Sequence, residues 1–122
     1  VRQICPACKH EATMTHEEMI KSFPADVIKE NWGIKAKYPV FKGQGCKLCR
    51  LSGYQGRVGL FEVLEVTAGI RKLIIEKADA DVIARAARGE GMKTILGDGF
   101  AKIAAGVTTV EEVLRVTKAE FV

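Results

Sequence analysis

Apolar residues after residue 67 recur at the i, i+3, i+4 spacing of amphipathic helices. The four stripes are Ile70, Leu73 and Ile74; Val82, Ile83, Ala86 and Ala87; Met92, Ile95, Leu96, Phe100 and Ile103; and Val113 and Leu114. Each stripe places an apolar face on one side of its segment, so we predict about four short helices whose stripes form the core.

Residues that begin or end helices flank these stripes. Asp79 is a candidate N-cap for the second helix, and Thr108-Thr109-Val110-Glu111 has the form of a capping box before the fourth. Gly106 is placed to end the third helix in the left-handed conformation. Gly97 and Gly99 lie inside the third stripe, where each costs about 1 kcal/mol relative to alanine. They predict a later helix start, with Asp98 as a candidate cap, or a close backbone contact.

The segment 57–66 alternates with the period of a strand. Val58, Leu60, Leu64 and Val66 fall on one face, and Phe61 and Val63 fall on the other. Apolar residues on both faces predict a buried strand. Glu62 interrupts the first face and needs a hydrogen-bonding partner or a place at the rim of the sheet.

Short elements are also predicted before residue 45. Thr15-His16-Glu17-Glu18 has the form of a capping box and predicts a helix over 16–23. After Pro24 we expect a second helix over 25–31, and then an extended segment over 38–41. Trp32, the only tryptophan, is expected to anchor these short elements against the rest of the first lobe, residues 1–66.

The four cysteines form two CxxC pairs, Cys5 with Cys8 and Cys46 with Cys49. Two cysteines three positions apart in a tight turn can aim both sulfurs at one point, and two such pairs complete the tetrahedron of a structural zinc site. Four thiolates leave no position for water or substrate. Because the site carries net negative charge, we expect backbone N–H groups and the neighbouring cations Lys9, Lys47 and Arg50 to point at the sulfurs.

Other interpretations of the cysteines remain open. Two disulfides would suit a small secreted domain, although no signal peptide accompanies these cysteines. A redox dithiol normally uses one CxxC at the start of a helix, whereas this chain has two. His10 is better explained as a solvated or neighbouring residue than as a ligand, since four cysteines already complete the site.

Length and composition predict a soluble globular piece of the α+β class, mainly α. The 122 residues divide near residue 66 into a tetracysteine zinc-binding lobe (1–66) with short strands, inserted helices and a terminal strand, and a small helical bundle (67–122). The absence of Met at position 1 favours a fragment of a longer protein. A net charge of +4 is far below that of a nucleic-acid-binding stripe, and no apolar run could span a bilayer.

Catalytic and nucleotide-binding residues are not predicted in this chain. The sequence Gly89-Glu90-Gly91-Met92-Lys93-Thr94 is not a phosphate loop, because Met92 separates the last glycine from the lysine and no strand precedes it. The remaining residues supply no set of nucleophile, base and oxyanion donor.

A resemblance covers nearly the whole chain. Gly45-Cys46-Lys47-Leu48-Cys49 and Ser52-Gly53-Tyr54-Gln55-Gly56-Arg57-Val58-Gly59-Leu60-Phe61-Glu62 resemble the tetracysteine region and following strand of the type II secretion and type IV pilus assembly ATPases. Later segments are similar to the C-terminal helical region of the same family: 70–74, Gly91-Met92-Lys93-Thr94, Asp98-Gly99 and 106–117. The stretch 15–38 has no counterpart, which leaves the subfamily open.

The resemblance implies a hexameric cytoplasmic motor that hydrolyses ATP with magnesium to drive secretion or pilus assembly. Its nucleotide site would lie in a domain preceding Cys5, so zinc is the only cofactor expected here. The expected partners are neighbouring subunits and an inner-membrane platform or other secretion or pilus component. The protein would be peripheral to the bacterial inner membrane through these partners, without membrane insertion or nucleic acid. The alternatives are a zinc-ribbon nucleic-acid-binding module and a redox sensor. If zinc holds the first lobe together, a strong chelator should unfold 1–66.

Overall fold

The structure is a computed structural model that describes residues 1–117. Its elements are, in order, β1 (Arg2–Ile4), β2 (Lys9–Thr15), α1 (His16–Ser22), α2 (Ala25–Asn31), β3 (Lys37–Gly43), β4 (Tyr54–Arg57), α3 (Ala68–Ile75), α4 (Ala80–Gly89), α5 (Ile95–Ala104) and α6 (Val110–Thr117). The chain is therefore α+β and mainly helical, as predicted.

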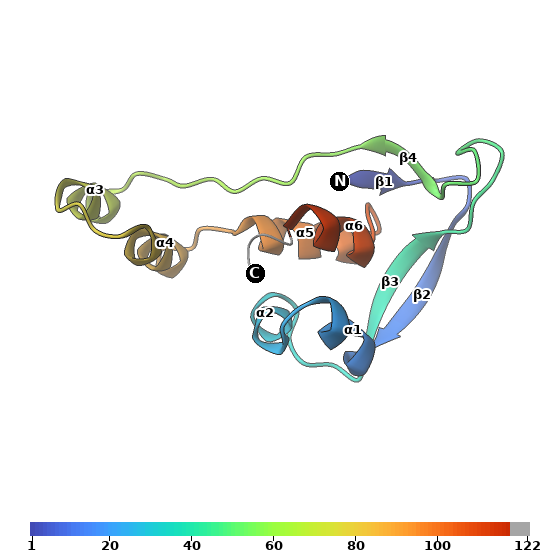
Figure 1. Ribbon diagram of the computed structural model, residues 1–122, viewed down its shortest axis with the longest axis horizontal. Helices are drawn as coiled ribbons and strands as arrows, with labels where there is room; N and C mark the ends of the chain where they lie inside the picture. The colour runs from blue at the N-terminus through green and yellow to red at the C-terminus, as the bar shows by residue number, and fades with distance from the viewer. Residues whose placement is uncertain (118–122) are drawn as a thin grey trace.

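Two antiparallel strand pairs organise the first half of the chain. β1 pairs with β4, and β2 pairs with β3 over seven residues from Lys9 opposite Gly43 to Thr15 opposite Lys37. Figure 1 shows the long β2–β3 hairpin carrying α1 and α2 at the end away from β1 and β4. The cysteine turns lie at the other end of this hairpin.

One hydrophobic core joins residues from both halves of the sequence. Met19, Phe23 and Ile28 of α1 and α2 pack with Phe100 and Ile103 of α5, and the same cluster includes Met14, Tyr38, Val40, Val110 and Val113. The ring centroids of Phe23 and Phe100 are 5.0 Å apart. The core therefore crosses the boundary predicted at residue 66.

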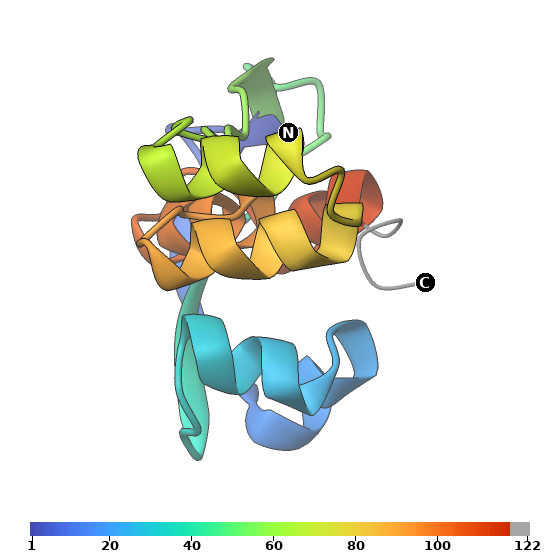
Figure 2. The ribbon, with the colours of Figure 1, turned by 90° about the vertical axis from the view of Figure 1, so that its left-hand side faces the viewer.

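The four helices predicted after residue 67 are present as two pairs. α3 packs with α4, and α5 packs with α6. Figure 2 shows α3 and α4 side by side, and Figure 1 shows this pair standing apart from the remaining elements. We call α3 and α4 together the α3–α4 hairpin.

Local capping follows the sequence closely. Thr15 Oγ1 accepts the N–H of Glu18 at 3.2 Å and begins α1, as predicted. The capping box predicted over Thr108 to Glu111 is displaced by one residue, because Thr109 Oγ1 accepts the N–H of Glu112 at 3.2 Å at the start of α6. Gly106 ends α5 with φ +76°. Asp98 does not cap α5: Thr94 Oγ1 does so by accepting the N–H of Gly97 at 3.0 Å.

Gly99 allows α5 to approach α6. A Cβ atom at Gly99 would lie 2.6 Å from Cγ1 of Val113, which is closer than real side chains come. The close backbone contact offered as one explanation for this glycine is therefore confirmed.

The prediction of a buried strand over 57–66 is wrong for the described chain. β4 ends at Arg57, and the segment that follows is extended without strand partners along most of its length. We call Val58–Val66 the arm. Val58 and Leu60 are half-buried, and the later apolar side chains are exposed, to 67% at Phe61 and 76% at Val63. The prediction for Glu62 holds, because its Oε2 accepts the N–H of Ile95 at 2.8 Å.

Trp32 also differs from its predicted position. Its ring packs against Tyr38, with centroids 5.2 Å apart, and edge-on against Phe100, with centroids 5.6 Å apart. It therefore anchors α2 on α5, a partner distant in sequence, and not on the cysteine turns.

A buried carboxylate fixes β1 to α6. The side chain of Glu112 is 2% exposed. It accepts the backbone N–H of Arg2 at 2.8 Å and guanidinium groups from Arg2 at 2.9 Å and Arg115 at 3.0 Å. Thr108 Oγ1 adds a hydrogen bond to the carbonyl of Arg2 at 2.8 Å. The N-terminal strand is thus held against the last described helix.

Candidate metal centre

The two CxxC turns come from opposite ends of the first half of the chain. Cys5 follows β1 and Cys8 precedes β2, while Cys46 and Cys49 lie in the loop between β3 and β4. We call this loop, 44–53, the knuckle. Backbone hydrogen bonds from Cys5 N to Gly53 O at 2.9 Å and from Gln44 N to Cys8 O at 3.2 Å hold the first turn against it.

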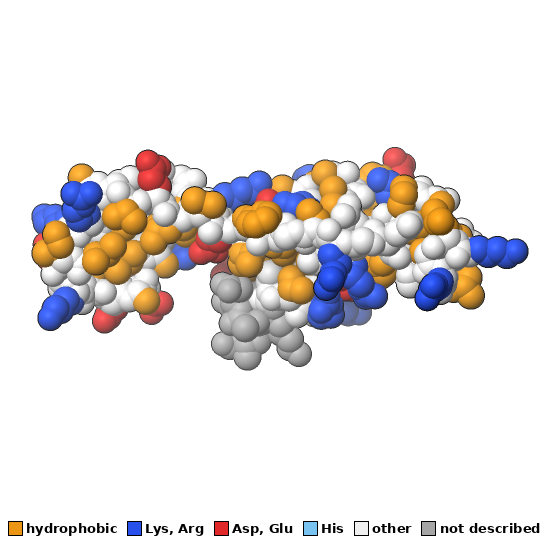
Figure 3. Space-filling model, turned by 90° about the horizontal axis from the view of Figure 1, so that it is seen from above, with side chains coloured by type: hydrophobic (Ala, Val, Ile, Leu, Met, Phe, Trp, Pro, Cys, Tyr) orange, Lys and Arg blue, Asp and Glu red, His pale blue; other side chains and the backbone are white. Residues whose placement is uncertain are grey.

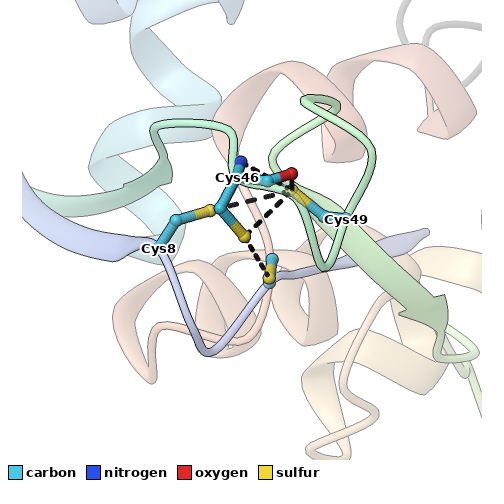
Figure 4. A group of neighbouring side chains, drawn as sticks. Cys8, Cys46 and Cys49 are labelled. Atoms are coloured by element: carbon cyan, nitrogen blue, oxygen red, sulfur yellow. Dashed lines mark hydrogen bonds between the residues drawn. The ribbon is translucent and has the colours of Figure 1, made fainter.

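All four cysteine sulfurs meet at one point. The Sγ atoms of Cys5, Cys8, Cys46 and Cys49 lie within 4.8 Å of one another and could hold a metal ion. The Sγ–Sγ distances are 3.8 Å for Cys5–Cys46, 3.9 Å for Cys8–Cys49 and 3.7 Å for Cys46–Cys49. Figure 4 shows Cys8 facing Cys46 and Cys49 across this cluster. A tetrahedral ion with zinc–sulfur bonds of about 2.3 Å would separate its sulfurs by about 3.8 Å.

Backbone N–H groups point at the sulfurs, as predicted. Gly45 N lies 3.3 Å from the sulfur of Cys8, and Cys46 N and Gly53 N lie 3.2 and 3.3 Å from the sulfur of Cys49. These donors favour the thiolate form that a metal requires.

Lys9 does not point at the cysteine sulfurs, contrary to the prediction. Its Nζ donates to the carbonyl of Gly106 at 3.2 Å and lies 5.5 Å from the ring centroid of Phe41. Within residues 1–117, the side chains of Lys47 and Arg50 make no hydrogen bond to a cysteine sulfur, and both residues are exposed. Backbone N–H groups thus provide the stabilisation of the thiolates that we expected from N–H groups and cations together.

The thiols of Cys49 and Cys8 differ in acidity. Burial alone would raise the pKa of Cys49, but N–H donation from Cys46 and Gly53 and contacts with the thiols of Cys46 and Cys8 lower it to about 6. For Cys8 the N–H of Gly45 lowers the pKa, whereas burial and the neighbouring thiols raise it to about 11. A metal that binds all four sulfurs must therefore displace protons.

Glycines let the knuckle fold tightly against β3. A Cβ atom at Gly43 would clash with the Gly53 carbonyl, and one at Gly53 would lie 2.6 Å from the Gly43 carbonyl oxygen. Sequence reasoning missed this contact between two distant glycines. It also missed Gln55, whose Oε1 lies 3.8 Å from the Cys5 sulfur.

Comparison with known proteins identifies the family. The model of the family described as "Type II/IV secretion system protein" matches residues 1–115. The chain belongs to this family. The match favours a secretion-ATPase interpretation over the nucleic-acid-binding zinc ribbon.

Individual relatives of the type II/IV secretion system family include proteins of both pathways. The chain is 35% identical over 118 residues to the type IV pilus assembly ATPase PilB of Pseudomonas aeruginosa, covering 96% of this chain and 19% of that protein. It is 36% identical over 120 residues to the type II secretion system protein E of Dickeya dadantii, covering 98% of this chain and 22% of that protein. The chain thus spans about a fifth of the length of these relatives.

Helices in the described part of this family member are short. Among residues 1–117, none is long and apolar enough to cross a membrane.

Proposed function

We propose that this chain is the C-terminal region of a longer motor ATPase of type II secretion or type IV pilus assembly. In that protein it is a zinc-stabilised structural and coupling module, and the nucleotide site for ATP and magnesium lies outside it. The similarity to named ATPases of both pathways supports this function.

The sulfur cluster is the observation that carries the proposal. Three of its six Sγ–Sγ distances are 3.7 to 3.9 Å, close to the spacing around a tetrahedral ion, and all six are within 4.8 Å. An all-sulfur tetrahedron suits zinc or iron. Under this proposal Cys5, Cys8, Cys46 and Cys49 are the ligands. Four protein ligands fill the coordination sphere, so the ion stabilises structure and leaves no open position for a substrate.

A metal bound here would act on more than the knuckle. Ile4 N donates to Val107 O at 2.9 Å, and Lys9 Nζ donates to Gly106 O at 3.2 Å. The residues flanking Cys5 and Cys8 are therefore tied to the turn between α5 and α6. This continuity supports a coupling role, because a force on the knuckle would reach the helical core.

The tip of the knuckle has the character of a contact surface. Leu48 is 60% exposed and Leu51 is 77% exposed, next to the cations Lys47 and Arg50. Exposed large apolar residues beside charges are typical of protein contacts. The partners we propose are neighbouring subunits of a homohexamer and an inner-membrane platform component, with the whole assembly on the cytoplasmic face.

Metal analysis of the freshly purified, reduced chain tests the site. We expect one zinc per chain, and Cys46→Ser should lower the metal content sharply because three sulfurs bind far more weakly. His10→Ala is the matched control: this residue is exposed next to the first CxxC turn and should leave the zinc content unchanged. Iron in place of zinc, no metal, or loss of metal in the His10 variant would each overturn the proposed site.

ATP hydrolysis by the longer protein tests the proposed motor function and the placement of the nucleotide site. We expect the longer protein to hydrolyse ATP, and we expect the isolated 122-residue chain to have no such activity. ATP hydrolysis by the isolated chain would contradict the placement of the nucleotide site.

A further inference from the structure

The arm is an extended segment whose backbone is largely unpaired. It follows β4 directly, and Figure 1 shows it running straight from β4 to α3. Within residues 1–117, the backbone N–H groups of Gly59, Leu60, Glu62, Val63 and Leu64 have no hydrogen-bond acceptor. Backbone donors of an extended apolar segment normally pair in a sheet.

The strand β1 ends beside one edge of the arm. Val1 N donates to Val58 O at 2.9 Å and Val58 N donates to Val1 O at 2.8 Å, so the two residues form a hydrogen-bonded antiparallel pair. This pair continues the register in which Arg2 lies opposite Arg57. One step back along β1 is one step forward along the arm, so a residue directly before Val1 would lie opposite Gly59.

The N–H directions along the arm agree with this register. Successive N–H groups of a strand point to opposite edges. The N–H of Val58 points to β1, so those of Leu60 and Glu62 face the same edge. The N–H of Phe61 faces the other edge, where Oδ2 of Asp98 accepts it at 3.0 Å. The unpaired donors of Leu60 and Glu62 thus lie on the side toward which an extended β1 would run, whereas those of Gly59 and Val63 share the edge of Phe61.

The two faces of the arm are also distinct. Leu60 lies over α5, with Cδ1 3.6 Å from the position of a Cβ at Gly99. On the opposite face the Phe61 ring folds over Gly59 and is 67% exposed. Figure 3 shows hydrophobic side chains at the surface along the middle of the molecule and over the α3–α4 hairpin. A strand added at the edge beside β1 would leave the α5 contact intact.

We propose that residues directly preceding Val1 in the longer protein continue β1 and pair antiparallel with Gly59–Glu62. This inference rests on the proposed function, under which the chain is the C-terminal region of a longer protein. The relatives are about five times as long as the matched segment, which covers 19% and 22% of them. A segment tethered at Val1 is held in register by the existing pair, so it has a far higher effective concentration than any free strand.

Such pairing would connect the segment before Val1 mechanically to the α3–α4 hairpin through the arm. The arm enters α3 through Thr67, whose Oγ1 donates to Glu90 Oε1 at 2.9 Å and thereby links the start of α3 to the end of α4. A displacement of the preceding segment would therefore move both helices together.

Residue-resolved amide hydrogen exchange tests the pairing. We compare the 122-residue chain with the same chain lengthened at its N-terminus by the natural preceding residues. Protection of the Leu60 and Glu62 amides should rise by about tenfold or more on lengthening, because these donors gain carbonyl acceptors. The Val63 amide, which faces the other edge, should change little.

Proline substitutions in the lengthened chain provide a matched pair. Leu60→Pro removes a donor that faces the proposed strand and should abolish the gain in protection at Glu62. Val63→Pro removes a donor on the opposite edge and should retain that gain. Equal effects of the two variants would contradict the proposed register.

Other results overturn the inference in distinct ways. Unchanged protection at Leu60 and Glu62 on lengthening would show that the preceding residues do not pair there. Protection that rises with the concentration of the 122-residue chain would assign the edge to a second copy. Zinc content and ATP hydrolysis, measured on the longer protein, report on the proposed function separately, because strand pairing requires neither result.

Discussion

Glu112 is a buried carboxylate among N–H donors from Arg2 and Arg115. Burial alone would raise its pKa, but the side chains of Arg115 and Arg2 and the backbone N–H of Arg2 outweigh burial and hold the pKa well below the usual value. A carboxyl group whose pKa is lower in the folded state stabilises the fold above its unfolded pKa, about 4.3. That contribution disappears as the pH falls through the acid range toward the folded value.

Glu112→Gln should therefore destabilise the chain at neutral pH and less so in acid. We expect a loss of about 2–3 kcal/mol at pH 7, since the buried acceptor loses its charge while its two arginines remain partly exposed. Below about pH 4 the difference from the natural chain should shrink. Denaturant unfolding at several pH values measures both effects. Glu111→Gln, an exposed neighbour on α6, is the control, and an equal loss in that variant would contradict the role assigned to Glu112.

At the scale of elements, the sequence predicts local features such as helix caps well. The caps at Thr15 and Gly106 depend on residues within one helical turn, so sequence spacing alone identifies them. The CxxC spacing likewise predicts that four sulfurs meet. Contacts between distant segments are not encoded in local spacing: the β1–β4 pairing and the seat of Trp32 on Phe100 both depend on the tertiary fold.

The arm shows how a correct pattern can predict the wrong element. Its alternating apolar residues do favour a strand, but a strand also needs a neighbour for its backbone. Within residues 1–117, β1 pairs with the arm only through Val1 and Val58, and Phe61 and Val63 are exposed. The sequence carries the preference for an extended backbone, and the structure shows which part of that backbone is paired within the described residues.

The knuckle is held by the sulfur cluster and by backbone hydrogen bonds, without large apolar side chains packed in the core. Arg50 and Leu51 adopt positive φ values of 55° and 66°, which ordinary residues tolerate only when their surroundings enforce them. Leu48 and Leu51 are exposed, so the loop contributes no large apolar side chain to the core. We therefore narrow the effect expected of metal removal from the whole of 1–66 to the knuckle and the turn of Cys5 and Cys8.

A strong chelator should release this region alone. Amide exchange at Leu51 and Gly53 should accelerate by orders of magnitude, because apparent zinc binding energies are about 10 kcal/mol or more. The fluorescence of Trp32 should remain unchanged, since its ring packs against Tyr38 and Phe100 at the far end of the β2–β3 hairpin. A large shift of Trp32 emission on verified metal removal would show that the whole first lobe depends on the ion.

Over the whole molecule, the buried residues do not follow the division at residue 66 that the sequence predicts. The central cluster joins α1 and α2 with α5 and α6, whereas Ile70 and Ala87 of the α3–α4 hairpin are buried outside that cluster. The helices on either side of residue 66 should therefore unfold together, and the α3–α4 hairpin, although continuous with them in sequence, should open separately.

Two core truncations distinguish this arrangement from a division at residue 66. Phe100→Ala removes a ring that packs against both Phe23 and Trp32. This change should lower the free energy of opening by about 3–5 kcal/mol in α1 and α2 as well as in α5 and α6. Ile70→Ala truncates a fully buried side chain of α3 and should weaken only the α3–α4 hairpin. Native-state hydrogen exchange measures each segment in both variants. If Phe100→Ala left the protection of α1 and α2 unchanged, the first 66 residues would be an independent folding unit and the shared core would carry no stability between the two halves.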